Sequence, residues 1–133
     1  MAEHKVHVAV GVLINANDEV LIARRTSNQV LAGYWEFPGG KLEANERPES
    51  ALVREFQEEV GVTPLVFEPI KEIVHRYTHN LVHLHVFKIT EFDGIAENRE
   101  WQQLRWVKRP ELGQYQFPEA NQAILQAIGV LCA

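Results

Sequence analysis

Three glutamates lie on one face of the helix that residues 48–60 predict, a stretch with no helix breaker after its first residue. At about 100° per residue, Glu55, Glu58 and Glu59 share a wedge of about 100°. This wedge borders the apolar stripe of the helix, so we expect its carboxylates at the edge of the core. The stripe consists of Leu52, Val53, Phe56 and Val60. Clustered carboxylate oxygens suit a hard cation such as Mg²⁺ or Mn²⁺.

An acidic helix face by itself is most often only solvated, so the preceding segment matters. Phe37-Pro38-Gly39-Gly40-Lys41 is expected to end a short strand in a loop, and its glycines let backbone groups approach a ligand closely. Mg²⁺ in proteins binds one or two carboxylates, keeps waters and binds substrate phosphates. The combination favours a site where a metal ion meets a phosphorylated ligand.

The elements that must position these residues follow from hydrophobic patterning and turn residues. Helix 48–60 begins with a proline in its first turn and stops at Gly61. The first two predicted strands are expected to pair as a hairpin across a turn at 15–18. The predicted strands cover 6–14, 19–24, 34–37, 70–77, 81–89 and 103–107, and a second helix covers 118–131. The mixture predicts an α/β sandwich with a mixed sheet between helices.

Composition limits the classes of function. The chain has 133 residues, 46% of them hydrophobic and 23% charged, so we expect a single globular domain over 1–133. A net charge of −5 argues against duplex nucleic acid or an anionic membrane as the main partner. The sequence has one cysteine, no signal peptide at its start and no long apolar run, so a cytoplasmic protein is expected.

The segment from 40 to 62 resembles the Nudix hydrolases. It reads Gly40-x5-Glu46-x7-Arg54-Glu55-Phe56-x-Glu58-Glu59-x-Gly61-Val62 and satisfies the whole signature of that family. Seven positions of the signature are fixed in residue type, so a chance match is on the order of one in a million. The resemblance implies a Nudix-type α/β/α sandwich and metal-dependent hydrolysis of a nucleoside diphosphate linked to another group.

The resemblance also implies roles for the residues of the signature. Glu58 and Glu59 match the family's metal ligands, with the carbonyl of Gly39 as a further contact. Glu55 matches the general base for the attacking water and is also expected near the metal. Arg54 would orient the glutamates by charge-assisted hydrogen bonds.

Three further glutamates have open roles. For Glu46, support of the loop–helix junction and a catalytic role are both open. Glu100 stands where the MutT branch of the family has another metal-contacting glutamate, although it could be an exposed loop charge. Glu97 is its neighbouring rival.

Further segments resemble the MutT branch, the 8-oxo-dGTP diphosphatases: Val8-Ala9-Val10-Gly11, Glu36-Phe37-Pro38-Gly39-Gly40-Lys41 and Phe117-Pro118-Glu119-Ala120-Asn121. This similarity extends along nearly the whole chain. It implies that Arg25 and Lys41 contact the nucleotide, that Phe37 and Pro118 form walls of its pocket, and that Asn121 reads the purine. Arg25 could instead be a solvated charge, and Asn121 could simply begin the last helix. An amide suits base reading because it offers one acceptor and two donors.

These assignments predict a monomeric, Mg²⁺-dependent nucleoside triphosphate pyrophosphohydrolase, with Mn²⁺ able to substitute. The predicted substrate is 8-oxo-dGTP, which would place the enzyme in sanitation of the nucleotide pool. A CTP or modified pyrimidine triphosphate pyrophosphohydrolase is the alternative, because His83-Leu84-His85 also resembles that group. A non-catalytic nucleotide-binding module is a third possibility, disfavoured because every carboxylate of the signature is present.

His83 and His85 point to one face of their predicted strand, because side chains alternate along it. A zinc pair would need a third ligand, and the sequence suggests none. Cross-strand polar contacts or a position in a pocket wall are therefore expected for both histidines.

Overall fold

The computed structural model describes residues 4–29, 31–77, 80–99 and 102–130, and its strands form two sheets. The elements follow one another as β1 (His4–Leu13), β2 (Glu19–Arg24), β3 (Trp35–Glu36), β4 (Gly39–Lys41), α1 (Pro48–Val60), β5 (Thr63–Arg76), β6 (Asn80–Asp93), β7 (Leu104–Lys108), the 3₁₀ turns Arg109–Gln114 and Glu119–Asn121, and α2 (Gln122–Ala127). None of the described helices is long and apolar enough to cross a membrane.

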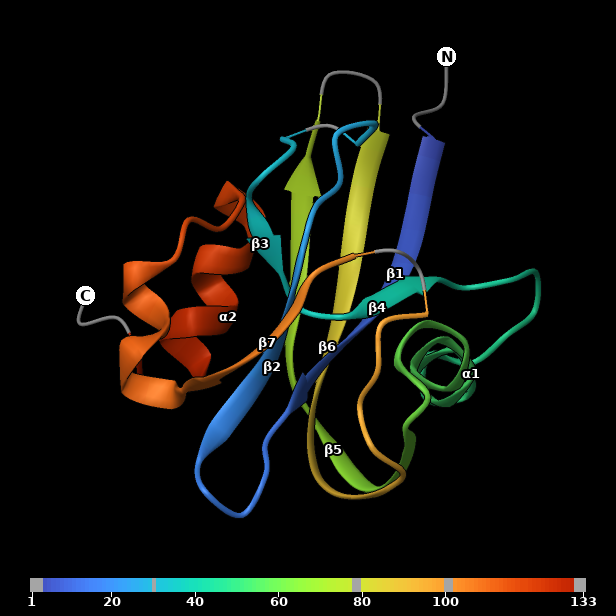
Figure 1. Cartoon of the computed structure of the whole chain (residues 1–133). Helices are drawn as coiled ribbons and strands as arrows, with labels where there is room; N and C mark the ends of the chain where they lie inside the picture. The colour runs from blue at the N-terminus through green and yellow to red at the C-terminus, as the bar shows by residue number, and fades with distance from the viewer. Residues whose placement is uncertain (1–3, 30, 78–79, 100–101, 131–133) are drawn as a thin grey trace.

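The larger sheet is mixed and has the strand order β4-β1-β6-β5. Its strand β1 runs parallel to β6 and antiparallel to β4. The smaller sheet, of order β3-β2-β7, is antiparallel. Helices α1 and α2 lie on opposite sides of the strands (Figure 1). The predicted α/β architecture with a mixed sheet between helices is confirmed, whereas the second sheet was not predicted.

Two apolar cores lie on the two faces of β1, because side chains alternate along a strand. Ala9 and Leu13 belong to the core shared with α1, whereas Val10 and Val12 belong to the core shared with α2. The continuous apolar character of β1 in the sequence therefore reflects burial on both faces.

Helix α1 has the predicted bounds for local reasons. Pro48 occupies its first turn, where no backbone donor is lost. Gly61 ends it in the left-handed region, with φ 72°, and donates its N–H to the carbonyl of Phe56. The Phe56 ring is fully buried against β1 at Gly11, where a Cβ would lie only 2.5 Å from the ring. The helix is thus held tightly to the sheet.

The expected hairpin between the first two strands is wrong. β1 is flanked on both sides by β4 and β6, so neither of its edges is free for β2. β2 instead joins β3 and β7, and the two early segments touch through one bridge, between Ile14 and Val20.

Other predicted boundaries are also corrected. The glycines expected in a loop form strand β4, since Gly39 approaches Ala9 so closely that a Cβ would lie 2.1 Å from its carbonyl oxygen. The last helix was predicted over 118–131 but covers Gln122–Ala127, because Pro118, with ψ 154°, is not helical and Gly129 is left-handed. Residue 131 lies outside the described residues. The strands predicted at 70–77 and 81–89 are both longer in the structure, as β5 and β6. β5 tolerates prolines because it is an edge strand with bulges.

Candidate active site

The glycines of β4 and the glutamates of α1 are in direct contact. The N–H of Gly39 donates to a carboxylate oxygen of Glu59 at 3.3 Å, and Glu59 is only 8% exposed. At Gly40, a Cβ would lie 2.2 Å from the carboxyl carbon of Glu55. Glycine is therefore required at this position for the Glu55 carboxylate to occupy its place beside the strand.

Arg54 organises the acidic face. Its guanidinium donates two hydrogen bonds to the carboxylate of Glu46, at 2.8 and 2.9 Å, and a third to Glu55 at 2.8 Å. The bond from Arg54, with a second from the backbone N–H of Glu43, lowers the pKa of Glu46 to about 2. In turn, the carboxylate of Glu46 is the main cause that raises the pKa of Arg54. Glu46 thus fixes the guanidinium of Arg54, which in turn fixes the carboxylate of Glu55.

Glu58 and Lys41 also contact Arg54, at longer distances than Glu46 and Glu55 do. The Glu58 side chain is 58% exposed, and its carboxylate lies 3.5 Å from a guanidinium nitrogen of Arg54. The carbonyl of Lys41 accepts a hydrogen bond from Arg54 at 3.1 Å. Lys41 lines a separate hollow beside Lys5 and Glu46, so its predicted contact with the nucleotide stays a prediction.

A polar cavity of about 380 Å³ opens over the buried carboxylates. The residues that line it are Thr26, Gln29, Glu36, Gly39, Glu55, Glu59 and Gln102. Each of them has an oxygen atom that can coordinate a cation, from a carboxylate, an amide, a hydroxyl or a backbone carbonyl. None of their side chains contains sulfur or imidazole. This donor set fits a hard divalent cation such as Mg²⁺.

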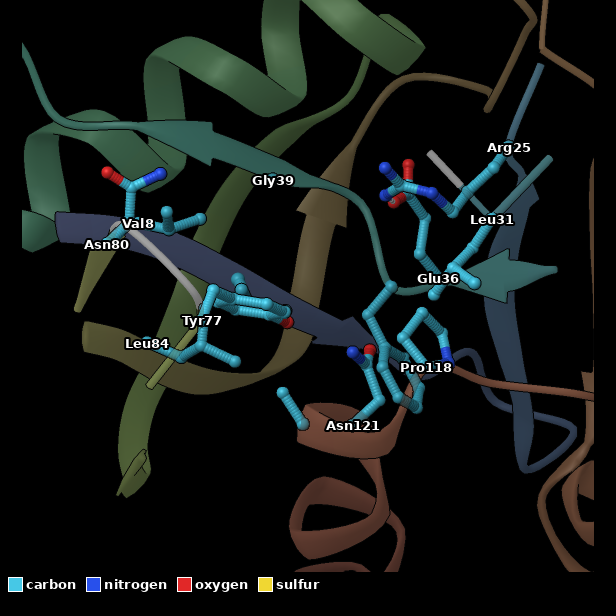
Figure 2. Close-up of a pocket in the computed structure, with 13 residues that line it drawn as sticks. Val8, Arg25, Leu31, Glu36, Gly39, Tyr77, Asn80, Leu84, Pro118 and Asn121 are labelled. Atoms are coloured by element: carbon cyan, nitrogen blue, oxygen red, sulfur yellow. Dashed lines mark hydrogen bonds and ion pairs between the residues drawn. The ribbon is translucent and has the colours of Figure 1, made fainter. Parts of the chain in front are cut away.

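A second, more apolar cavity of about 420 Å³ adjoins the first, because Glu36 and Gly39 line both. Figure 2 shows Asn121 at the start of α2 with Pro118 on one side and Tyr77 on the other. The remaining lining residues are Val8, Val10, Arg25, Leu31, Phe37, Asn80, Leu84 and Ala120. A cavity with apolar walls and few polar groups is typical of small-molecule binding.

Four of the residues predicted to bind substrate are therefore brought together in one cavity. Arg25 forms an ion pair with Glu36 in its wall. Phe37 is buried and stacks on Phe117, with ring centroids 5.1 Å apart. The other two, Pro118 and Asn121, line the cavity as described.

Sequence reasoning missed several lining residues. Glu36 belongs to the predicted strand 34–37, yet no role was predicted for it. Gln102 is buried and donates to the Glu36 carboxylate at 3.1 Å. Tyr77 directly follows β5, Asn80 begins β6, and both line the cavity although they lie outside the signature. No local motif marks these residues, because only strand pairing brings them to the site.

The two rival glutamates after β6 have different outcomes. Glu97 pairs with Arg99 at 2.7 Å, and its backbone N–H donates to the carbonyl of Val60 at the end of α1. Glu97 therefore helps to close the helix end. Glu100 lies outside the described residues, so its predicted metal contact stays a prediction.

Comparison with known proteins agrees with this geometry. The NUDIX domain family model matches residues 9–127. The 8-oxo-dGTP diphosphatase of Escherichia coli K12 is 36% identical over 91% of this chain and 94% of its own. The CTP pyrophosphohydrolase of the same organism is 34% identical over 93% of this chain and 92% of its own.

Among solved structures, one from a study of MutT from Aliivibrio salmonicida and Vibrio cholerae has a TM-score of 0.81 at 35% identity. The similarity covers 93% of this chain and 96% of that one. A family model over most of the chain, relatives above 30% identity and a shared fold lead to one conclusion. This chain belongs to the NUDIX domain family.

Proposed function

We propose that this protein is a Mg²⁺-dependent hydrolase that converts 8-oxo-dGTP and water to 8-oxo-dGMP and pyrophosphate. The observation that carries the proposal is the junction of two cavities at Gly39 and Glu36, one acidic and one largely apolar. A nucleotide with its base in the apolar cavity has its phosphates directed to the carboxylates. The reaction breaks the anhydride bond between the α and β phosphates.

We propose separate tasks for the residues in and near the acidic cavity. Glu55, Glu59 and the carbonyl of Gly39 would hold the divalent cation, with Glu58 and Glu100 as further ligands. When bound, Mg²⁺ supplies neutralisation of phosphate charge and a lower pKa for water. Glu55 is proposed to accept the proton of the attacking water at its carboxylate, because Arg54 fixes that carboxylate at 2.8 Å.

The apolar cavity supports selection of the oxidised base. Guanine oxidised at C8 carries a hydrogen on N7, so an acceptor of normal guanine becomes a donor. The carbonyl of the Asn121 amide can accept from this position, whereas two acceptors would face each other with normal guanine. Such unpaired groups cost about 1–3 kcal/mol each, enough for roughly 10- to 100-fold discrimination.

The test is a turnover screen with Mg²⁺ over 8-oxo-dGTP, dGTP, CTP and a modified pyrimidine triphosphate. We expect the highest kcat/KM for 8-oxo-dGTP with pyrophosphate as a product. Glu59→Gln should lower kcat by about 100-fold or more, because electrostatic groups at a reaction centre contribute that much. Glu68→Gln, on exposed β5 surface, is the control and should retain parent activity. Parent-like turnover by Glu59→Gln would contradict the assigned role.

Base recognition is tested separately. Asn121→Ala should lower the kcat/KM ratio of 8-oxo-dGTP to dGTP by about tenfold or more, with the activity on dGTP less affected. An unchanged ratio would remove Asn121 from base reading while leaving the hydrolytic chemistry intact.

A second candidate is hydrolysis of CTP or a modified pyrimidine triphosphate at the same site. The observation in its favour is the 34% identical CTP pyrophosphohydrolase, together with the His83-Leu84-His85 strand. Equal kcat/KM for 8-oxo-dGTP and dGTP, with a pyrimidine triphosphate preferred, would select it. Binding of nucleotide without turnover in saturating Mg²⁺ or Mn²⁺ would favour a non-catalytic module instead.

We also propose that the enzyme acts as a one-domain monomer on the cytoplasmic nucleotide pool, where removal of oxidised precursors prevents misincorporation during DNA replication. Light scattering of the purified protein checks the monomer.

A further inference from the structure

Three histidines from distant parts of the sequence meet on the sheet face that also carries α1. β1 and β6 pair in parallel with His7 opposite His83, and His85 follows two residues later on the same face. On the other side of β6, the antiparallel β5 places Glu72 opposite His85. The three strands are neighbours in the larger sheet (Figure 1). The sequence suggested no third metal ligand beside His83 and His85, and the structure supplies His7.

The imidazoles are close enough to share one ligand. One ring nitrogen from each of His7, His83 and His85 lies within 4.8 Å of the other two. Nδ1 of His7 is 3.0 Å from Nε2 of His85, and the rings of His83 and His85 stack in parallel at 4.3 Å. Ligand nitrogens around a tetrahedral zinc ion are roughly 3.3 Å apart. A shared ion therefore requires the stacked rings of His83 and His85 to turn out of parallel, because the lone pair of a ring nitrogen lies in the plane of its ring.

Glu72 contacts the opposite side of the cluster. Its carboxylate lies 2.7 Å from Nε2 of His83 and 3.8 Å from Nδ1 of His85. A carboxylate only accepts, so Nε2 of His83 carries the proton, and the lone pair of the neutral ring is on Nδ1. Nδ1 of His83 is buried and has no hydrogen-bond partner in the described structure. An unpartnered lone pair beside two more imidazoles is the arrangement of a metal ligand.

We propose that His7, His83 and His85 bind a transition-metal ion of the zinc class, through Nδ1, Nδ1 and Nε2 respectively, with Glu72 as the carboxylate that orients the ring of His83. Three imidazoles with a carboxylate behind them form a recurrent zinc environment that leaves a fourth position for water. Imidazole nitrogen favours zinc over magnesium, which prefers oxygen. The site is thus chemically distinct from the acidic cavity.

The surroundings are compatible with this assignment. Burial, followed by the nearby ring of His83, lowers the pKa of both His7 and His85, so these rings are neutral and able to bind a metal. Glu49 and Glu72 contribute negative charge near His85, whereas Lys5 opposes a cation near His7. None of the three histidines lines the acidic cavity, so this proposal and the proposed hydrolysis stand or fall separately.

The test measures the affinity of the untagged full-length protein for zinc alone. A chromogenic zinc chelator competes with the protein for the metal in millimolar Mg²⁺. Magnesium occupies oxygen sites and leaves imidazoles free. We expect one zinc ion per chain, with affinity lowered by more than about 100-fold in His7→Gln or His85→Gln. Glu72→Gln should lower it by about 10- to 100-fold, as expected for a carboxylate that orients ligands. His75→Gln is the matched control, because His75 contacts Tyr77 and lies outside the cluster.

A second measurement needs no variant. X-ray absorption at the zinc edge of the parent protein, in Mg²⁺, should show scattering from three imidazole rings. Failure of the parent to retain zinc, equal affinity in His85→Gln, or an oxygen-only shell would each overturn the proposal.

Discussion

The glutamates of the signature differ in exposure although they lie on one helix. Glu59 is buried against β4, whereas Glu58 is largely exposed, because its direction on the helix turns it away from the apolar stripe. The buried carboxylate makes its contact with the N–H of Gly39, and Glu55 fits beside Gly40. At the residue scale, the site depends on glycines as much as on acids.

Gly40→Ala should therefore lower activity with little loss of stability. The added Cβ meets the Glu55 carboxyl carbon at 2.2 Å, and the flexible end of that side chain must move aside. A displacement of about 1 Å at a reacting group can cost about 100-fold, so we expect kcat to fall by that order with the melting temperature nearly unchanged.

Gly113→Ala is the control, because the nearest atom to its Cβ is 3.9 Å away, on Val130. Steady-state kinetics and thermal unfolding of both variants check the prediction. Activity of Gly40→Ala within a few-fold of the parent would show that turnover does not depend on the position of the Glu55 carboxylate.

At the element scale, Arg54 joins α1 to the segment that precedes it. The arginine contacts Glu46 through two hydrogen bonds and the carbonyl of Lys41 through a third. Three bonds from one guanidinium fix the entry of the helix relative to β4. These contacts place Glu46 at the junction of the loop and the helix, one of the two roles that the sequence left open.

This junction predicts a dependence of stability on pH. The pKa of Glu46 is lowered to about 2 in the folded protein, against 4.5 for the unperturbed side chain. A lowered native pKa contributes stability that is complete above the unfolded pKa and is lost as pH falls toward the folded one. The destabilisation caused by Glu46→Gln should thus be large at about pH 6 and shrink toward pH 3.

Urea unfolding of the parent and Glu46→Gln at the two pH values measures this difference. Glu68→Gln, which removes an exposed carboxylate on β5, serves as the control. A parent-to-variant difference that stays constant with pH would contradict the role of Glu46.

At the scale of the whole molecule, the sheets separate two cores, and each core supports one part of the site. The core beneath α1 holds the glutamates against β4, while the core beneath α2 holds Phe37, Phe117 and the start of α2 around the apolar cavity. The two cavities meet where the chain passes from β3 in the smaller sheet to β4 in the larger sheet. The buried carboxylates and the apolar cavity thus rest on different cores.

Phe56→Ala should destabilise the whole protein. Phe56 is fully buried between α1 and β1, and truncation of such a ring costs about 3–5 kcal/mol. This is a large part of the roughly 5–15 kcal/mol that holds a typical domain together. Val53→Ala, at a half-buried position on the same helix, should cost much less. Urea unfolding measures both, and equal losses would show that α1 is not anchored through Phe56.

Local chemistry made much of this protein predictable from its sequence. Pro48 and Gly61 act on their own turns, so the helix bounds were predicted correctly, and the glutamate wedge follows from helical geometry alone. The contact of that wedge with the glycines was also predictable, because only a few residues separate β4 from α1.

Tertiary structure alone decided which strands are neighbours. β1 pairs with β6 rather than β2, and this choice places His7 beside His85, 78 residues away. The same pairing brings Tyr77 and Asn80 to the apolar cavity. Each strand has two edges that can accept many partners, and the selection depends on burial across the whole sheet, which no local pattern encodes.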